Sequence, residues 1–482
     1  MLFLLLLSFR LGFFRENPAA VRNMHLAVGV LPAKDDAWFT ISQGRRKIGY
    51  AHRRFFPTEA GYRLTEEVLL RINTMGVVQA LNFQTEGNLD SRLTLTSFNF
   101  RLNSSLFRFA ASGVVRDRLL TLHAGVPGEE RKLSIILREP LHLSSGIFDV
   151  SRFAGLQPGE SRTFHVFDPV AMGERPVRVS LSEGEEVILH QGRKKRARKV
   201  SLDFMGTTQF AWLGEDGAVL KEQGILGITL EKSAKQEALK GIEPGESADL
   251  TELASIQANK TIGDPDSVRE LRVRLGNLGD TAFFLDGGRQ TLQKDILLIR
   301  KEAIPAAGRG DKIGKDSPSL KPSPLIQSDH PLIVGKAREI VSAGDTEAAK
   351  AEKIVKWVYK HVKKRPVLSV PNALETLTNL VGDCNEHAVL VAALARAAGI
   401  PAEVEAGLVY LRGRFYYHAW NVLYLGEWIT ADAVFGQMPA DVTHLRFVRG
   451  AAERQMDLLG LVGRVHLEIL DGFVKSQKSS PP

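Results

Sequence analysis

The N-terminal half of the chain alternates apolar and polar residues with a period of two. Between about residues 38 and 230, segments such as GYRLTEEVLLRIN, VVQALNFQTEG and SRLTLTSFNFRLN carry this pattern, and turn-forming residues separate them. Successive side chains of a strand point to opposite faces, so the pattern predicts an antiparallel sheet with one buried and one solvated face. We expect a large curved sheet or a sandwich.

The hydrophobic period changes in the C-terminal third of the chain. The segment PLIVGKAREIVSAGDTEAAKAEKIVKWVYKHVKKR, at 331–365, places apolar residues near helical spacing on either side of a Gly-Asp pair, which predicts two helices. PNALETLTNL predicts a third, short helix, and the apolar run that follows Asp383 predicts a fourth. Helices therefore open the C-terminal domain.

These changes of pattern predict an α+β protein, in which β-rich domains precede a domain with helices packed on an antiparallel sheet. A length of 482 residues favours two or three domains. The predicted parts are a hydrophobic leader or anchor (1–35), an antiparallel β-rich domain (36–245), a second β-rich segment (246–305), a linker rich in Gly, Pro, Ser and charge (306–328), and a C-terminal domain (329–482).

The first residues, MLFLLLLSFRLGFF, resemble the apolar part of an export signal. The run is shorter than the roughly 20 residues that a membrane-spanning helix needs. We expect an exported protein, periplasmic or anchored by its N-terminus and facing away from the cytoplasm. The alternative is a mis-assigned start or a buried N-terminal segment.

Composition narrows the kinds of site that the chain can hold. Its net charge of +8 is modest and spread along the sequence, so we expect no nucleic-acid partner. Cys384 is the single cysteine, which excludes an intrachain disulfide and any metal site that needs several thiolates. We expect no cofactor and no metal, although Cys384, His387, His418 and Asp432 are an alternative set of metal ligands.

Cys384 stands at the start of a predicted helix. Asp383 precedes the apolar run and Glu386 follows three residues later, which predicts a capping box with Cys384 as the first helical residue. Gly399 and Pro401 end the helix. Free N–H groups and the positive end of the helix dipole stabilise a thiolate at such a position. The neighbouring Asp383 opposes this effect, so a partner cation would help.

The segment FYYHAWNVLYLGEWITADAVFG predicts two strands joined by a turn, and the length of the turn decides which side chains meet. A three-residue loop at 425–427 pairs Tyr424 with Trp428 and makes His418 a diagonal neighbour of Asp432, at about 7–8 Å between backbones. A two-residue loop would place them on opposite faces. The chain then offers a thiol, an imidazole and a carboxylate, the components of a Cys-His-Asp triad.

Three segments together resemble the core motifs of the transglutaminase-like superfamily: GDCNEHAVLVAALARAAGIPA, FYYHAWNVLYLGEW and ITADAVFGQMPAD, with Cys, His and Asp in that order. The similar region runs from about 331 to 448. The resemblance implies a papain-like core, with Cys384 as nucleophile at a helix N-terminus, His418 as base and Asp432 as the residue that orients the base. Asn421-Val422 stand where many relatives carry an acidic residue, and Ala433-Val434 stand where many carry Pro-Thr.

The same resemblance implies a thiol-dependent acyl-transfer enzyme, an amidase or peptidase or a transglutaminase-like enzyme, that forms a thioester intermediate. The expected partner is a peptide-like or wall-derived amide substrate. The backbone N–H of Cys384 is one expected donor to the oxyanion, and Trp357 is a candidate for a second. The alternative is a catalytically silent exported protein whose N-terminal sheet binds a lipid, a glycan or another protein.

Several polar residues near these motifs have weaker assignments. We expect His387 to be a packing residue or to support the site from behind Cys384. We expect Trp420 and Trp428 to belong to the core, with shaping of the cleft as a further role. Three further side chains are candidates for the edge of a substrate groove or for the surface: Gln437, Asp441 and His444.

Overall fold

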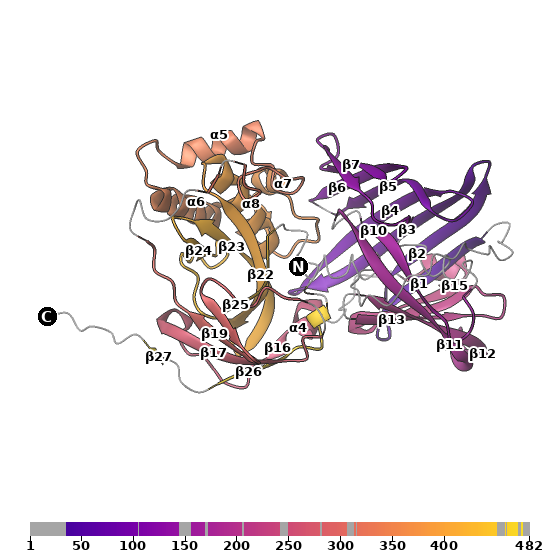
Figure 1. The fold of residues 1–482 in the computed structure, drawn as a ribbon. Coiled ribbons are helices and arrows are strands. Elements are labelled where there is room, and N and C mark those ends of the chain that lie inside the picture. The colour runs from indigo at the N-terminus through magenta and orange to yellow at the C-terminus, as the bar shows by residue number, and fades with distance from the viewer. Residues whose placement is uncertain are drawn as a thin grey trace. The chain divides into compact units, whose positions relative to one another are not determined.

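The structure of the chain is a computed structural model (Figure 1). It describes residues 35–104, 106–143, 156–168, 172–204, 207–241, 249–279, 282–305, 313–314, 316–450, 458, 460–470 and 474–475. The predicted leader lies outside these residues except for its last position, and so do 306–312 and 315 of the predicted linker. The chain forms two compact units: one ends at residue 250 and includes 368–370, and the other comprises the remainder from residue 251.

The N-terminal unit is built on one strongly curved sheet, which has 15 strands in the described residues (Figure 1). The strand order is β8-β7-β6-β5-β4-β3-β2-β1-β15-β14-β13-β12-β11-β10-β9, and neighbours are antiparallel except for β9 and β10. The strands are β1 (Asp35–Gln43), β2 (Arg46–Thr58), β3 (Gly61–Thr74), β4 (Val77–Leu89), β5 (Leu95–Asn103), β6 (Arg108–Arg116), β7 (Leu119–Gly125), β8 (Arg131–Ile136), β9 (Leu141–Leu143), β10 (Ser161–Asp168), β11 (Gly173–His190), β12 (Arg193–Phe204), β13 (Thr207–Leu213), β14 (Val219–Gln223) and β15 (Ile228–Ser233).

Burial alternates along most of these strands, as the period of two predicts. In β3 every second residue from Leu64 to Thr74 is buried. The buried face carries many aromatic rings, and Phe98 of β5 packs on Phe167 of β10, with 4.8 Å between ring centroids. These two strands are not neighbours in the sheet, so the sheet folds over and packs its apolar face against itself. The predicted antiparallel β-rich region is confirmed.

The C-terminal unit contains helices and three small sheets. The helices are α4 (Leu250–Ala254, at the boundary), α5 (Pro331–Ile340), α6 (Glu347–His361), α7 (Ala373–Asn379) and α8 (Cys384–Ala397). Its strands are β16 (Ile256–Gln257), β17 (Val268–Gly276), β18 (Gln290–Gln293), β19 (Ile296–Arg300), β20 (Lys363–Lys364), β21 (Val381–Gly382), β22 (Ala402–Leu411), β23 (Arg414–Tyr424), β24 (Trp428–Ala431), β25 (His444–Gly450), β26 (His466–Ile469) and β27 (Val474–Lys475). A short α3 (Lys235–Leu239) and two 3₁₀ turns, η2 (Ile225–Gly227) and η3 (Pro265–Ser267), complete the described elements.

The sheet that positions the site has the order β16-β23-β22-β25, with β24 also paired to β23. α8 packs on β22 and β23, and α5, α6 and α7 pack around α8. From 385 to 395 every residue of α8 is buried, so it is the central helix of the unit. In the part of the chain that the structure describes, no helix has the length and apolarity that crossing a membrane requires.

Two segments expected outside the C-terminal domain are part of this unit. The second β-rich segment contributes β16, which pairs with β23, and β17, which pairs with β26. The last part of the predicted linker is packed rather than solvated, because residues 324–328, Leu325 and Ile326 among them, are buried. The linker prediction is wrong for these residues, whereas Pro318, Lys321 and Pro322 are exposed.

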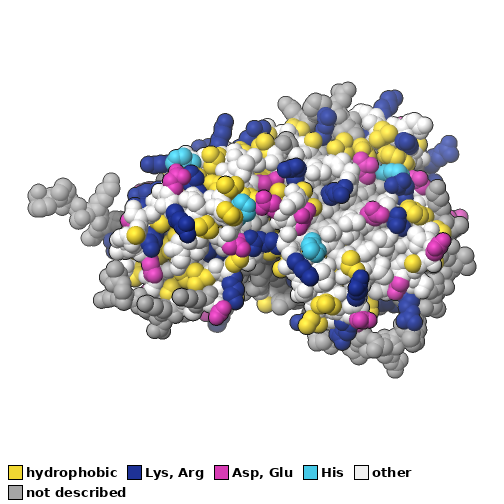
Figure 2. Space-filling model, turned by 90° about the horizontal axis from the view of Figure 1, so that it is seen from above, with side chains coloured by type: hydrophobic (Ala, Val, Ile, Leu, Met, Phe, Trp, Pro, Cys, Tyr) yellow, Lys and Arg dark blue, Asp and Glu magenta, His cyan; other side chains and the backbone are white. Residues whose placement is uncertain are grey.

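Charge on the surface follows the mixed composition of the chain. Figure 2 shows basic side chains scattered among acidic ones over the visible face, rather than gathered into one patch.

Candidate active site

Cys384 is the first residue of α8, and a capping box fixes the start of that helix. The Asp383 carboxylate accepts from the N–H of Asn385 at 2.9 Å, and the Asp383 N–H donates to the Glu386 carboxylate at 2.9 Å. Gly382 makes room for this arrangement, since a Cβ there would lie 2.2 Å from the Cβ of Glu386. The predicted capping box is confirmed, and Cys384 remains partly exposed at the helix start.

His418 and Asp432 are brought together by the hairpin of β23 and β24. Tyr424 pairs with Trp428, so the connection is the three-residue loop that the sequence predicts. The register continues to Asn421 opposite Ala431, which places Asp432 one residue beyond the end of β24. His418 Nε2 then donates to Asp432 Oδ2 at 2.6 Å. The predicted side-chain contact is confirmed.

Asp432 is fully buried and all of its acceptor capacity is used. Oδ1 accepts from the backbone N–H groups of Val434 at 2.6 Å and Phe435 at 3.2 Å. Oδ2 accepts from His418 and, at 3.0 Å, from Nε2 of His444. Burial alone would raise the pKa of Asp432, but the two imidazoles hold it well below its usual range. The residue is therefore a fixed anion.

His418 lies between this anion and the thiol. Burial lowers the pKa of His418, but the Asp432 carboxylate and a hydrogen bond with the Cys384 side chain together raise that pKa to about 9. The ring also stacks on Phe435, with centroids 5.2 Å apart and planes inclined by 18°. An imidazolium in contact with a thiol at a helix N-terminus is an arrangement that stabilises a thiolate.

His444 completes the site, and sequence reasoning assigned it wrongly to a groove edge or the surface. Its side chain is completely buried. Nε2 contacts Asp432 and Nδ1 lies 3.3 Å from Asp441 Oδ1. Asp441 is buried as well, and its Oδ1 accepts from the N–H and hydroxyl of Thr443. Residues 433–443 have no hydrophobic period, so nothing in the sequence indicated that His444 turns back toward Asp432.

Gln437, the third of these candidates, lies in the same irregular segment. Its side-chain nitrogen donates to Asp441 Oδ2 at 3.0 Å and to Asp266 at 2.9 Å. Gln437 therefore helps to hold Asp441 in place beneath His444.

The other predicted residues have mainly structural contacts. His387 is buried, and its Nδ1 lies 2.7 Å from the backbone oxygen of Asp383. Trp357 stacks on His361 of its own helix, with 4.6 Å between centroids, so its described contacts do not support a donor role toward Cys384. Asn421 donates to the backbone oxygen of Ala388 at 2.9 Å and thereby ties β23 to α8.

Two tryptophans were expected in the core, and they differ in burial. Trp420 is buried, and its indole donates to Glu405 at 2.9 Å. Trp428 is half-buried under Arg449.

One group of side chains in the described residues has the spacing of metal ligands: His418, Asp432 and His444, whose ligand atoms lie within 4.8 Å of one another. Cys384 and His387 are not part of this group. Both imidazoles already donate to Asp432, so binding of an ion would require both of these nitrogens to lose their protons. The fit to a metal is therefore poor, and the absence of metal and cofactor stays a prediction.

Comparisons with known proteins found one family model and several solved structures that are similar to parts of the chain. A candidate cysteine protease from Cytophaga hutchinsonii is 17% identical, with 44% of this chain and 82% of that one covered and a TM-score of 0.26. A beta-barrel-like protein of unknown function from Brucella abortus is 12% identical, with 43% of this chain and 98% of that one covered and a TM-score of 0.32. The periplasmic domain of TgpA from Pseudomonas aeruginosa, bound to ethylmercury, is 15% identical, with 39% of this chain and 93% of that one covered and a TM-score of 0.27. No curated protein matches the chain. The model of the transglutaminase-like superfamily matches residues 335–433, a range that includes Cys384, His418 and Asp432. The comparisons therefore show a region within the C-terminal unit, about a fifth of the chain, that is similar to the transglutaminase-like superfamily.

Proposed function

We propose that the C-terminal unit is a thiol-dependent acyl-transfer enzyme that acts on amide bonds. The observation that carries this proposal is the buried His418–Asp432 pair, 2.6 Å apart, with the single cysteine of the chain near enough to His418 to contribute to its raised pKa. A carboxylate that fixes an imidazole, and an imidazole that activates a thiol, are the parts that nucleophilic catalysis requires. The family match over these three residues supports the same assignment.

In the proposed reaction, the Cys384 thiolate attacks the amide carbonyl carbon and the carbonyl oxygen becomes an oxyanion. The backbone N–H of Cys384, at the first position of α8, has no partner within the helix and is placed to donate to that oxyanion. The His418 imidazolium then gives its proton to the leaving amine as the C–N bond breaks, which leaves a thioester. Water or an amine attacks the thioester while neutral His418 accepts its proton, and the thiol is released.

The proposal extends to the setting of the enzyme. The apolar run at the start of the sequence supports export, to the periplasm or to a membrane-anchored position facing away from the cytoplasm. A peptide-like or wall-derived amide is the substrate class that fits this location. Hydrolysis and aminolysis use the same three side chains and differ only in which acceptor reaches the thioester.

The test uses the fact that Cys384 is the only thiol in the chain, so alkylation by iodoacetamide reports on it alone. An ordinary thiol near pKa 8.5 is about 0.3% thiolate at pH 6. We expect the wild-type protein to react at least about tenfold faster at pH 6 than His418→Ala or Asp432→Ala, after allowance for the lower nucleophilicity of an acidic thiol. His466→Ala, at an exposed position of β26, is the control. Equal rates in all four proteins would contradict the proposal.

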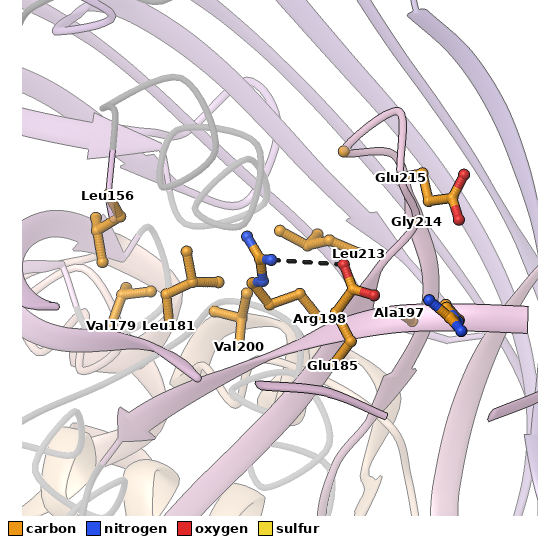
Figure 3. A pocket seen from close by; sticks show the side chains of 12 residues that line it. Leu156, Val179, Leu181, Glu185, Ala197, Arg198, Val200, Leu213, Gly214 and Glu215 are labelled. Atoms are coloured by element: carbon orange, nitrogen blue, oxygen red, sulfur yellow. Dashed lines mark hydrogen bonds and ion pairs between the residues drawn. The ribbon is translucent and has the colours of Figure 1, made fainter. Parts of the chain in front are cut away.

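A second candidate function, binding of a small ligand by the N-terminal unit, is favoured by one observation. A pocket of about 320 Å³ opens at β11, β12 and β13 (Figure 3). Six of its lining residues are apolar and four are charged, and two of the charged ones, Arg198 and Glu185, pair on adjacent strands and lie 3.5 Å apart (Figure 3). The volume is at the lower end of the range for ligand pockets. The apolar lining residues are Leu156, Val179, Leu181, Ala197, Val200 and Leu213.

Two substitutions on one strand test this candidate. Leu181→Trp on β11 fills the pocket, whereas Leu189→Trp on the same strand adds the same side chain at an exposed position that does not line it. If the pocket binds apolar anions, anilinonaphthalene sulfonate fluorescence falls in the Leu181 variant and persists in the Leu189 variant. Equal binding by both variants would rule the pocket out as its site.

A further inference from the structure

The second histidine of the site has no role in the reaction as written above. His444 is completely buried, yet both of its ring nitrogens face carboxylates. We propose, resting on the proposed function, that His444 is a positioning residue: a fixed imidazolium that shares the Asp432 carboxylate with His418 and so makes His418 a better proton donor than Asp432 alone would allow.

The protonation state follows from the hydrogen-bond partners. Nε2 of His444 lies 3.0 Å from Asp432 Oδ2, and Nδ1 lies 3.3 Å from both the backbone oxygen and Oδ1 of Asp441. All of these atoms are acceptors. A neutral imidazole carries one N–H, so it would turn a bare nitrogen lone pair toward one of the carboxylates. Only the imidazolium donates on both sides. In agreement, the two carboxylates outweigh burial and raise the pKa of His444 to about 9.

The acceptors of His444 are held in place independently of it. Asp441 Oδ1 accepts from the N–H of Thr443 at 2.8 Å and from its hydroxyl at 2.6 Å. The other carboxylate, Asp432, is fixed through Oδ1 by two backbone N–H groups. The His444 ring therefore lies between two carboxylates whose orientation is fixed. The backbone oxygen of His444 also accepts a hydrogen bond from Arg289 at 3.1 Å.

The arrangement forms a chain of alternating charge, Asp441–His444–Asp432–His418, that leads to the thiol. The rings of His444 and His418 are 5.8 Å apart between centroids, and both donate to the same oxygen of Asp432. A cation at this distance opposes the attraction of Asp432 for the His418 proton. Within the described residues, further ionisable groups that act on these four residues include Cys384 and His387 from α8, Lys364 from β20, and Arg289 before β18.

This opposition matters for turnover. His418 must hold a proton to support the thiolate and then release it to the leaving amine, and a general acid is most effective when its pKa lies near the working pH. A buried carboxylate with no second cation would hold that proton more tightly. Because Asp432 also accepts a hydrogen bond from the His444 cation, it attracts the His418 proton less strongly. The hydrogen bond that orients the His418 ring remains.

The first experiment compares His444→Gln with the wild-type protein by the pH dependence of iodoacetamide alkylation. The alkylation rate of an imidazolium–thiolate pair has a lower inflection, where the thiolate forms, and an upper one, where the imidazolium loses its proton. Loss of the His444 cation should move the upper inflection to higher pH by about one to two units, for charges about 6 Å apart at an effective dielectric constant near 20. His466→Gln is the matched control and should leave it unchanged.

The second experiment reads the wild-type protein directly and does not depend on the variant folding. With ¹⁵N-labelled histidine, NMR at pH 7.5 should show one imidazole with both nitrogens protonated that exchanges slowly with water, in addition to His418. Asp441→Asn should convert it to a neutral tautomer, which assigns it to His444. A single-proton tautomer for His444 in the wild-type protein would overturn the inference.

The outcomes separate the two proposals. If alkylation does not depend on His418, the proposed function fails while the NMR signature of His444 can still be present. If alkylation depends on His418 but the upper inflection of folded His444→Gln stays at the wild-type pH, the positioning role of His444 is wrong and the proposed function stands. A purely structural role would lower the stability of that variant without moving the inflection.

Discussion

Replacing Asp432 by Asn should destabilise the C-terminal unit by about 3–5 kcal/mol, the range for removal of one partner from a buried ion pair. The asparagine oxygen can still accept from Val434 and Phe435, as Oδ1 does now. Its NH₂ group, however, would face the N–H groups of His418 and His444, which now lie 2.6 and 3.0 Å from Oδ2. Two charge-assisted hydrogen bonds are lost, at about 1.5–3 kcal/mol each, which gives a similar total.

Hydrogen–deuterium exchange of the full-length protein measures this loss locally. In Asp432→Asn, the opening free energy that protects the amides of β22 and β23 from exchange should be about 3–5 kcal/mol smaller than in the wild-type protein. This decrease cannot exceed the free energy of unfolding of the unit. Amides of β3 and β4, in the N-terminal unit, provide the internal control and should exchange unchanged. A difference below about 1 kcal/mol at β23 would refute the assignment of Asp432 as the fixed anion of this network.

The effect should depend on pH in one direction. The pKa of His418 is raised to about 9 in the folded protein, from about 6.5 for a free imidazole. Stability from a raised pKa is fully present below the unfolded value and is lost as pH rises through the folded one. The difference between wild type and Asp432→Asn should therefore be largest near pH 6 and shrink toward pH 9. A difference that grows across this interval would contradict the charge assignment.

Three further substitutions test the supports of the site. Gly382→Ala would bring a Cβ to 2.2 Å from the Cβ of Glu386, so it should cost about 1–3 kcal/mol of stability and slow Cys384 alkylation. Unchanged alkylation kinetics would contradict the view that the capping box positions Cys384. Thr346→Ala removes the N-cap of α6 and should cost about 1 kcal/mol in denaturant unfolding with no change in alkylation rate. Glu405→Gln breaks the buried pair with Arg446, 3.2 Å apart, and should lower protection of β22 amides by about 3–5 kcal/mol; normal protection would exclude a stabilising pair.

The parts of the site that lie on periodic elements could be predicted from the sequence. The start of α8 follows from a capping box, because Asp383 and Glu386 have the spacing at which each side chain satisfies a backbone N–H of the first turn. The contact of His418 with Asp432 follows from loop length, because a three-residue turn fixes which side chains share a face. In both cases local geometry determines the result.

The parts that depend on distant or irregular segments could not be predicted. His444 reaches Asp432 through a stretch whose path is set by the side-chain hydrogen bonds of Asp441, and no hydrophobic pattern records such bonds. Leu325 and Ile326 are buried within a stretch whose Pro and Ser content is typical of a linker. The pairing of β16 with β23 joins residues more than 150 positions apart, and strand alternation alone does not say which strands pair.

The order β16-β23-β22-β25 has a practical consequence for any excised fragment. β25 begins at His444, beyond the end of the matched family region, and β16 lies well before its start. A fragment cut to 335–433 would expose the backbone of β22 along one edge and lose the strand that carries His444, leaving an unpaired edge of the kind that promotes aggregation. The smallest autonomously folding piece should therefore extend from about residue 251 to 470, with the family region as its centre rather than its boundary.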